Sequence, residues 1–179
     1  MFPRLRAVAA WPAASLATGM LTACAPALDW RDVRPADSGV QLLMPCKATP
    51  QARQLRLSGR AVKLSLHACS AGGHTWALAF ADVTDPTQVG GALNELRAAA
   101  ANNLGATAVQ PVALAVPGAT PHPASERVLI AGRLPNGQPV QEQVAVFAFG
   151  TRVFQATVLA EALNTEAVET FFGALRVAP

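Results

Sequence analysis

The sequence has little of what acid–base catalysis needs. It has no tyrosine and only three histidines in 179 residues, so few side chains can transfer protons near neutral pH. No Gly-x-Ser-x-Gly motif occurs, and Gly90-Gly91 lies inside a predicted helix, not in a phosphate-binding loop between strand and helix. We therefore predict that the protein is not an enzyme and has no catalytic residue and no cofactor.

An excess of one charge sign is also missing. The net charge is +3, from 14 basic and 11 acidic residues. Arg4 and Arg6 lie in a segment that we expect to be removed, which leaves 12 basic residues against 11 acidic ones. A nearly neutral chain offers no basic surface to neutralise phosphates, so we predict no nucleic-acid partner.

No apolar run is long enough to form a transmembrane helix. The longest, residues 7–20, has 14 residues and contains Pro12, whereas a membrane-spanning helix needs about 20 residues. Two arginines precede this run and small residues follow it, which is the pattern of an export signal. We predict a signal peptide over residues 1–23.

The segment Leu21-Thr22-Ala23-Cys24 resembles the lipobox of bacterial lipoproteins, which implies that the Cys24 thiol is alkylated with diacylglycerol before cleavage ahead of it. The alternative is an ordinary secretory signal followed by a chance cysteine. Ala25, where an aspartate would resemble inner-membrane retention signals, favours the outer membrane, with the protein facing the periplasm. Residues 24–38 have no sustained period and predict a tether.

The remaining segment, 39–179, predicts a single domain that begins with strands. Alternating apolar residues between turn signals predict strands over 40–46, 54–57, 61–69 and 75–83. A three-residue loop at 70–72 would put Leu66 opposite Trp76 and both apolar sets on one face. We predict that register.

Two helices and two later hairpins complete the pattern. Asp85 is a suitable N-cap for a helix from Pro86 to Leu104 with one apolar stripe, and residues 166–175 predict a second helix capped by Asn164 or Thr165. The turns Asn136-Gly137 and Gly150-Thr151 predict hairpins over residues 127–160. The fold class is therefore α+β, an antiparallel β-sheet with a central long helix and a C-terminal helix packed on it.

The domain also resembles bacterial relatives of the photosystem II extrinsic protein PsbP. The resemblance is carried by Leu43-Met44-Pro45-Cys46-Lys47, by the strand ending at Asp82 and by Phe171-Phe172-Gly173-Ala174-Leu175-Arg176. It implies an antiparallel sheet between helices, an α/β/α sandwich, and an accessory role without catalytic residues. Cys46 stands where that family usually has glycine.

Cys46 and Cys69 form an even pair once Cys24 is lipidated, and in an oxidising compartment they predict a disulfide. Two buried free thiols are the alternative. His67 and His74 could join the two cysteines in a zinc site, although neither Cys-x-Cys nor His-x-x-x-His spacing is present. We predict no metal.

The expected function is binding. We predict a lipid-anchored, non-catalytic accessory subunit of a larger envelope assembly, with an unknown envelope protein as partner and the proline-rich segment 111–123 as one possible docking region. One alternative is a carrier of an apolar ligand between helix and sheet, although Ala77, Ala79 and Ala81 favour close packing there. Another is a hydrolytic enzyme that uses Asp82 and Asp85 as paired carboxylates.

The lipid anchor is directly testable. Replacing Cys24 by serine removes the thiol that lipid transfer requires. Because cleavage follows lipid transfer, we expect Cys24→Ser protein to lack the lipid, to keep its signal segment, and so to be processed and retained differently from the parent. Fractionation of cells that produce the parent or the variant measures this. Processing and membrane retention equal to those of the parent would contradict the prediction.

Overall fold

The computed structural model describes residues 27–178. In chain order the elements are β1 (Arg31–Val33), β2 (Val40–Met44), β3 (Thr49–Leu57), β4 (Arg60–Ala71), β5 (His74–Asp82), η1 (Pro86–Gln88), α1 (Val89–Asn103), β6 (Ala108–Val112), β7 (Glu126–Arg133), β8 (Pro139–Phe149), β9 (Arg152–Ala160), α2 (Thr165–Gly173) and β10 (Arg176–Val177). No helix among the described residues is both long and apolar enough to cross a bilayer.

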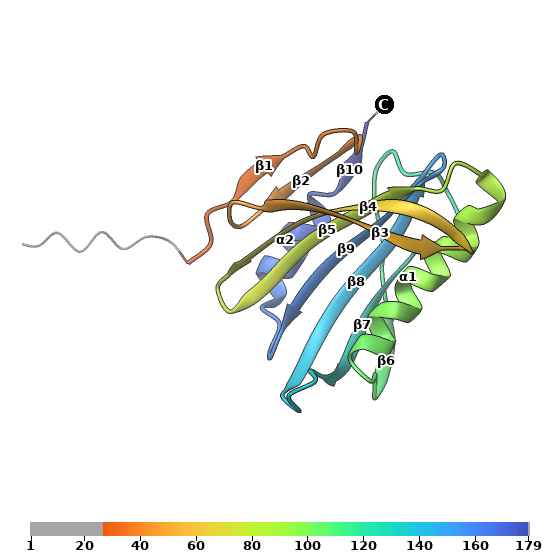
Figure 1. The fold of residues 1–179 in the computed structure, drawn as a ribbon. Coiled ribbons are helices and arrows are strands. Elements are labelled where there is room, and N and C mark those ends of the chain that lie inside the picture. The colour runs from red at the N-terminus through yellow and green to blue at the C-terminus, as the bar shows by residue number, and fades with distance from the viewer. Residues whose placement is uncertain (1–26, 179) are drawn as a thin grey trace, which may run out of the picture.

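The described chain forms three layers around a central sheet (Figure 1). Seven antiparallel strands pair in the order β3-β4-β5-β9-β8-β7-β6, and β1, β2 and β10 form a small second sheet. The first apolar core lies between α1 and one face of the large sheet, and the second lies between the other face and α2 with the small sheet. The predicted α+β class, with an antiparallel sheet and helices packed on it, is confirmed.

The late hairpins form where the sequence predicts them. Gly137 and Gly150 both have positive φ, as turn glycines do. Phe147 lies opposite Phe154 across the second hairpin, and their rings stack with centroids 4.9 Å apart. In β8 the side chains from Val144 to Ala148 are fully buried, because this strand is covered on both faces.

The predicted register between β4 and β5 is wrong. Cys69, and not Leu66, lies opposite Trp76, and His67 lies opposite Leu78. The turn is the two-residue Gly72-Gly73, with positive φ at both positions, so the strands extend to Ala71 and His74 and the register shifts by three residues. Both faces of β5 are largely buried, so the order of apolar residues along this strand does not select one register with β4.

Both helices agree with their predicted positions. Asp85 caps η1 by accepting a hydrogen bond from the Thr87 N–H at 3.0 Å, and Gly105 follows α1 with φ of 51°. The predicted apolar stripe of the central helix is buried along its whole length and comprises Val89, Leu93, Leu96, Ala100 and Leu104. Asn164 caps α2 by accepting from the Ala167 N–H at 2.9 Å.

The segment expected to be a tether joins the fold in its described part. Leu28 and Trp30 pack against the second core, and the Trp30 and Trp76 rings meet edge to face with centroids 5.7 Å apart. Residues 31–33 form β1, which pairs with β2. The folded domain therefore begins before residue 39, because residues 28–38 make contacts with segments that are distant in the sequence.

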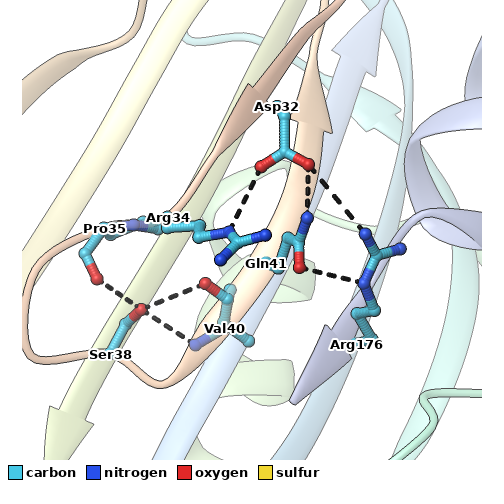
Figure 2. Close-up of polar contacts among 7 residues, drawn as sticks. All are labelled: Asp32, Arg34, Pro35, Ser38, Val40, Gln41 and Arg176. Carbon is cyan, nitrogen blue, oxygen red and sulfur yellow. Dashed lines mark hydrogen bonds and ion pairs between the residues drawn. The ribbon is translucent and has the colours of Figure 1, made fainter. Parts of the chain in front are cut away.

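Polar contacts also hold this segment in place (Figure 2). Asp32 lies beside Arg34, Arg176 and the Gln41 amide, which donates to it, and these contacts connect β1, β2 and β10. Ser38 is fully buried, and its hydroxyl donates to the Pro35 carbonyl at 2.7 Å. The polar contacts of Asp32 therefore have a structural role, because they link the three strands of the small sheet.

The Cys46–Cys69 disulfide is present, with the two Cα atoms 6.0 Å apart. It joins the segment after β2 to β4, and its 23-residue separation corresponds to about 3 kcal/mol of stabilisation through the restricted unfolded chain. Cys24, the predicted lipidation site, lies outside the described residues.

Candidate functional site

The four residues considered for a metal site each make other contacts in the fold. Cys46 and Cys69 are bonded to each other. The two ring nitrogens of His74 contact the Gly72 carbonyl at 2.7 Å and the Asn164 N–H at 3.0 Å, so this ring links the β4–β5 turn to the α2 cap. His67 stacks on Phe80, and burial lowers its pKa. Within residues 27–178 no three His, Cys, Asp or Glu side chains gather to hold a metal ion.

The carboxylates of Asp82 and Asp85 have separate local roles. Asp82 accepts hydrogen bonds from the Thr84 N–H at 2.8 Å and the Thr151 hydroxyl at 2.9 Å. The carboxylate of Asp85 accepts from Thr87, and these hydrogen bonds lower its pKa. Each stabilises a turn or a helix start, and the structure shows no pairing between them.

Arg127 is a buried charged side chain that is paired within the fold. It is 5% exposed and lies 2.7 Å from Glu169 of α2 and 2.8 Å from the Gln143 side chain. Its guanidinium also lies 4.0 Å from the centre of the Phe172 ring. The group is satisfied within the fold and connects α2 to the sheet.

A cleft of about 410 Å³ opens between α1 and the large sheet. Leucine and alanine side chains make most of its floor, and polar groups stand at its two ends. Its lining comprises Arg53, Leu55, Arg56 and Leu57 of β3, Leu64 and Leu66 of β4, Ala77 and Ala79 of β5, Glu95, Leu96, Ala99, Ala100 and Asn103 of α1, Glu142 of β8, and Gln155 and Thr157 of β9.

The position of α1 explains this cleft. The helix contacts the sheet mainly through β8 and β9. Ala81 of β5 is buried in the first core with α1, whereas Ala77 and Ala79 lie at the edge of that core. The alanines were expected to favour close helix packing, but here Ala77 and Ala79 line open space. At the other end Glu95 of α1 accepts a hydrogen bond from the Ser58 N–H at 2.8 Å, so the β3–β4 turn is tied to the helix across the cleft.

Glu142 is the unusual group of the cleft. It is 8% exposed and faces the cleft, and its carboxylate makes no hydrogen bond with the described residues. Its oxygens are not among the fully enclosed polar atoms, so the cleft is their remaining access to solvent. Its cross-strand neighbours on this face are Ile130 of β7 and Leu159 of β9. Burial raises its pKa from the usual 4.5 to about 7, because a carboxylate with little water and no counterion is unfavourable.

The sequence contains a signal for this residue that the predictions missed. Glu142 falls between Val140 and Val144 in β8, on the positions of period two that are buried. Gln155 and Thr157 lie on the same face of β9 as Val153 and Leu159 and are half-buried. Polar residues at apolar positions of adjacent strands indicate a polar site on that face.

Comparisons with known proteins add no homologue. No protein-family model matches the chain, and no curated protein matches it. The function is therefore inferred from the cleft and from the chemistry of the side chains that line it.

The unpaired carboxylate predicts a specific pH dependence of stability. Because the folded-state pKa of Glu142 is raised, its contribution is fully present below about pH 4.5 and is lost as the pH rises through about 7. Replacement by glutamine removes the charge at every pH, so we expect Glu142→Gln to raise the melting temperature at pH 8 and to change it little at pH 4.5.

Thermal unfolding of parent and variant between pH 4.5 and 8 measures this difference. Other titrating groups, such as His67, act in both proteins and cancel in the comparison. A difference in melting temperature that does not change with pH would show that Glu142 is not desolvated.

Proposed function

We propose that the chain is a lipid-anchored protein of the cell envelope that acts by binding, with the cleft beneath α1 as its binding site. The observation that carries the proposal is the cleft itself, whose volume of about 410 Å³ is within the usual range for small-molecule sites. Its lining combines nine leucine and alanine side chains with seven polar or charged ones, so it offers both an apolar surface and groups that can orient a ligand. This is the carrier function that the sequence offered as an alternative.

Anchoring at Cys24 would hold the domain close to the membrane. Leu28 is packed in the second core, and four residues of chain reach at most about 14 Å. Leu28 also lies against the β4–β5 turn, since a Cβ added to Gly72 would be 2.9 Å from its side chain. With this anchor, the β4–β5 end of the sheet would face the lipid. The membrane would be the outer one, because Ala25 and not aspartate follows Cys24.

The cleft ends on the same side. Glu142 of β8 lies opposite Leu159 of β9, and Leu159 lies opposite Thr75 of β5. Thr75 is the second residue of β5 after the β4–β5 turn. In this orientation the Glu142 end of the cleft is the end nearer the membrane. A ligand with an apolar body could pass between the lipid and the cleft over a short distance.

Binding is favoured over catalysis by the roles that the ionisable groups already have. Asp82, Asp85 and His74 are hydrogen-bonded to local backbone or to turn residues. In the cleft, Glu142 has apolar cross-strand neighbours, without a nucleophile or base beside it in the sheet register. A hydrolytic site would need such groups to converge.

A second candidate is the accessory subunit that the resemblance to PsbP relatives implies. The observation in its favour is β3, an edge strand of nine residues that pairs only with β4 within the described chain. Such an edge can accept a strand from a partner protein. The segment 111–123 is less suitable for docking, because Leu114, Val116 and Ala119 pack against the second core.

The cleft can be tested with the neutral fluorescent probe N-phenyl-1-naphthylamine. We expect saturable binding with one site per chain. Ala99 of α1 is exposed and lines the cleft, so a tryptophan there would fill much of the space. We expect Ala99→Trp to cost about 1.4 kcal/mol of binding or more, which is a tenfold loss of affinity.

Asn94→Trp is the matched control, because Asn94 is exposed on the same helix and does not line the cleft. It should bind the probe as the parent does. Equal loss in both variants, or no saturable binding by the parent, would contradict a binding site in the cleft.

A further inference from the structure

The surroundings of Glu142 restrict what the cleft can hold. Apolar side chains face it from β7 and β9, namely Ile130 and Leu159, and from its own strand, namely Val140 and Val144. From the C-terminal turns of α1, the cleft-lining residues are Ala99, Ala100 and Asn103, whose amide is neutral. No basic side chain of the described residues forms an ion pair with Glu142.

The other charged groups of the cleft lie at its far end. Arg53 and Arg56 belong to β3, which is four strands from β8, or about 19 Å along the sheet at 4.8 Å per strand. Both arginines are exposed, and Arg56 donates to the Gly59 carbonyl at 2.6 Å. Glu95 is engaged by the Ser58 N–H at 2.8 Å. Arg53 also makes no ion pair or hydrogen bond with the described residues, but it is exposed to solvent. Glu142 is therefore the buried charged side chain of the cleft that has no partner among the described residues.

We propose that the cleft binds an elongated amphiphile with a cationic amine or ammonium head, which pairs with the Glu142 carboxylate while its apolar body lies over the alanines and leucines of β5 and β4. The proposal rests on the proposed function of the cleft as a binding site. It adds the chemical class of the ligand.

Physical chemistry favours the cation over other head groups. A carboxylate with little water around it is unfavourable alone, and a cation brought by the ligand restores the missing interaction in a medium where charges are weakly screened. An anionic head would be repelled by the same carboxylate. A neutral head would leave Glu142 as it is in the free protein, so only the apolar body would contribute to affinity.

The charge on Glu142 makes binding depend on pH. Its pKa of about 7 means that the carboxylate is largely protonated at pH 6 and ionised at pH 8.5. A permanently charged ligand should therefore bind more tightly at pH 8.5 and release a proton when it binds near pH 7. Arg53 and Arg56 carry fixed positive charge at the opposite end, and Glu95 stays hydrogen-bonded to the β3–β4 turn.

The test compares three probes that share an octyl chain and differ in the head: octyltrimethylammonium, octyl glucoside and octyl sulfate. Each is titrated below its micelle concentration into purified, oxidised full-length protein carrying Cys24→Ser, with calorimetric detection at pH 6 and pH 8.5. We expect the ammonium probe to bind most tightly at pH 8.5, and Glu142→Gln to weaken it by about tenfold or more and to remove its pH dependence.

Glu161→Gln is the control, because Glu161 follows β9 at the same end of the sheet, is exposed and does not line the cleft. It should leave all three affinities unchanged. Octyl glucoside should bind the Glu142→Gln protein at least as well as the parent, which confirms that the variant is folded and its cleft intact.

The outcomes separate the two proposals. Equal affinity for the ammonium and glucoside probes, unaffected by Glu142→Gln, would overturn the cationic ligand class and leave the cleft as a binding site. Tighter binding of octyl sulfate would overturn it in favour of an anionic head near the arginines. Binding of none of the probes would overturn the cleft as a binding site.

Discussion

The contact of α1 with β8 and β9 determines the shape of the molecule on the side that carries the cleft. The apolar stripe of this helix packs closest on those strands, and the cleft opens beside it over parts of β3, β4 and β5. The C-terminal end of α1 lies close against β7. A Cβ on Gly132 of β7 would be 2.4 Å from the Leu104 carbonyl oxygen, and the Arg133 N–H donates to that oxygen at 2.8 Å. The N-terminal half is held by the hydrogen bond from Ser58 to Glu95.

The opposite face of the sheet supports this arrangement from below. Trp76 is fully buried and contacts Trp30, His74 and Phe171, which come from the N-terminal segment, the β4–β5 turn and α2. The disulfide joins the same region to β4, directly opposite Trp76. The strands that form the floor of the cleft are therefore packed from the other side against the second core.

Local signals made much of the fold predictable from sequence. The Asp85 cap, the stripe of α1 and the Gly150 turn each depend on a few adjacent residues. The disulfide was predicted from an even pair of cysteines and the expectation of an oxidising compartment. The β4–β5 register failed because Gly72 and Gly73 both take positive φ, while the apolar residues on both faces of β5 fit either parity.

The remaining errors come from contacts distant in sequence. β6 was not predicted because it contains Pro111, which is tolerated on an edge strand. Leu28 and Trp30 stand alone in a charged segment, and their packing depends on strands that follow much later. The cleft could not be read from the β5 alanines alone, because it depends on which strands α1 crosses. Glu142 could have been identified from the period of β8.

The central claim is that the buried carboxylate of Glu142 lies in a ligand-binding cleft, and a carbon-13 NMR titration of that carboxyl group tests it most directly. In the free protein the titration midpoint should lie near 7. With saturating octyltrimethylammonium it should fall, because a bound cation favours the charged form. A midpoint near the usual value of 4.5 that the probe does not change would contradict both the burial of this group and its role in binding.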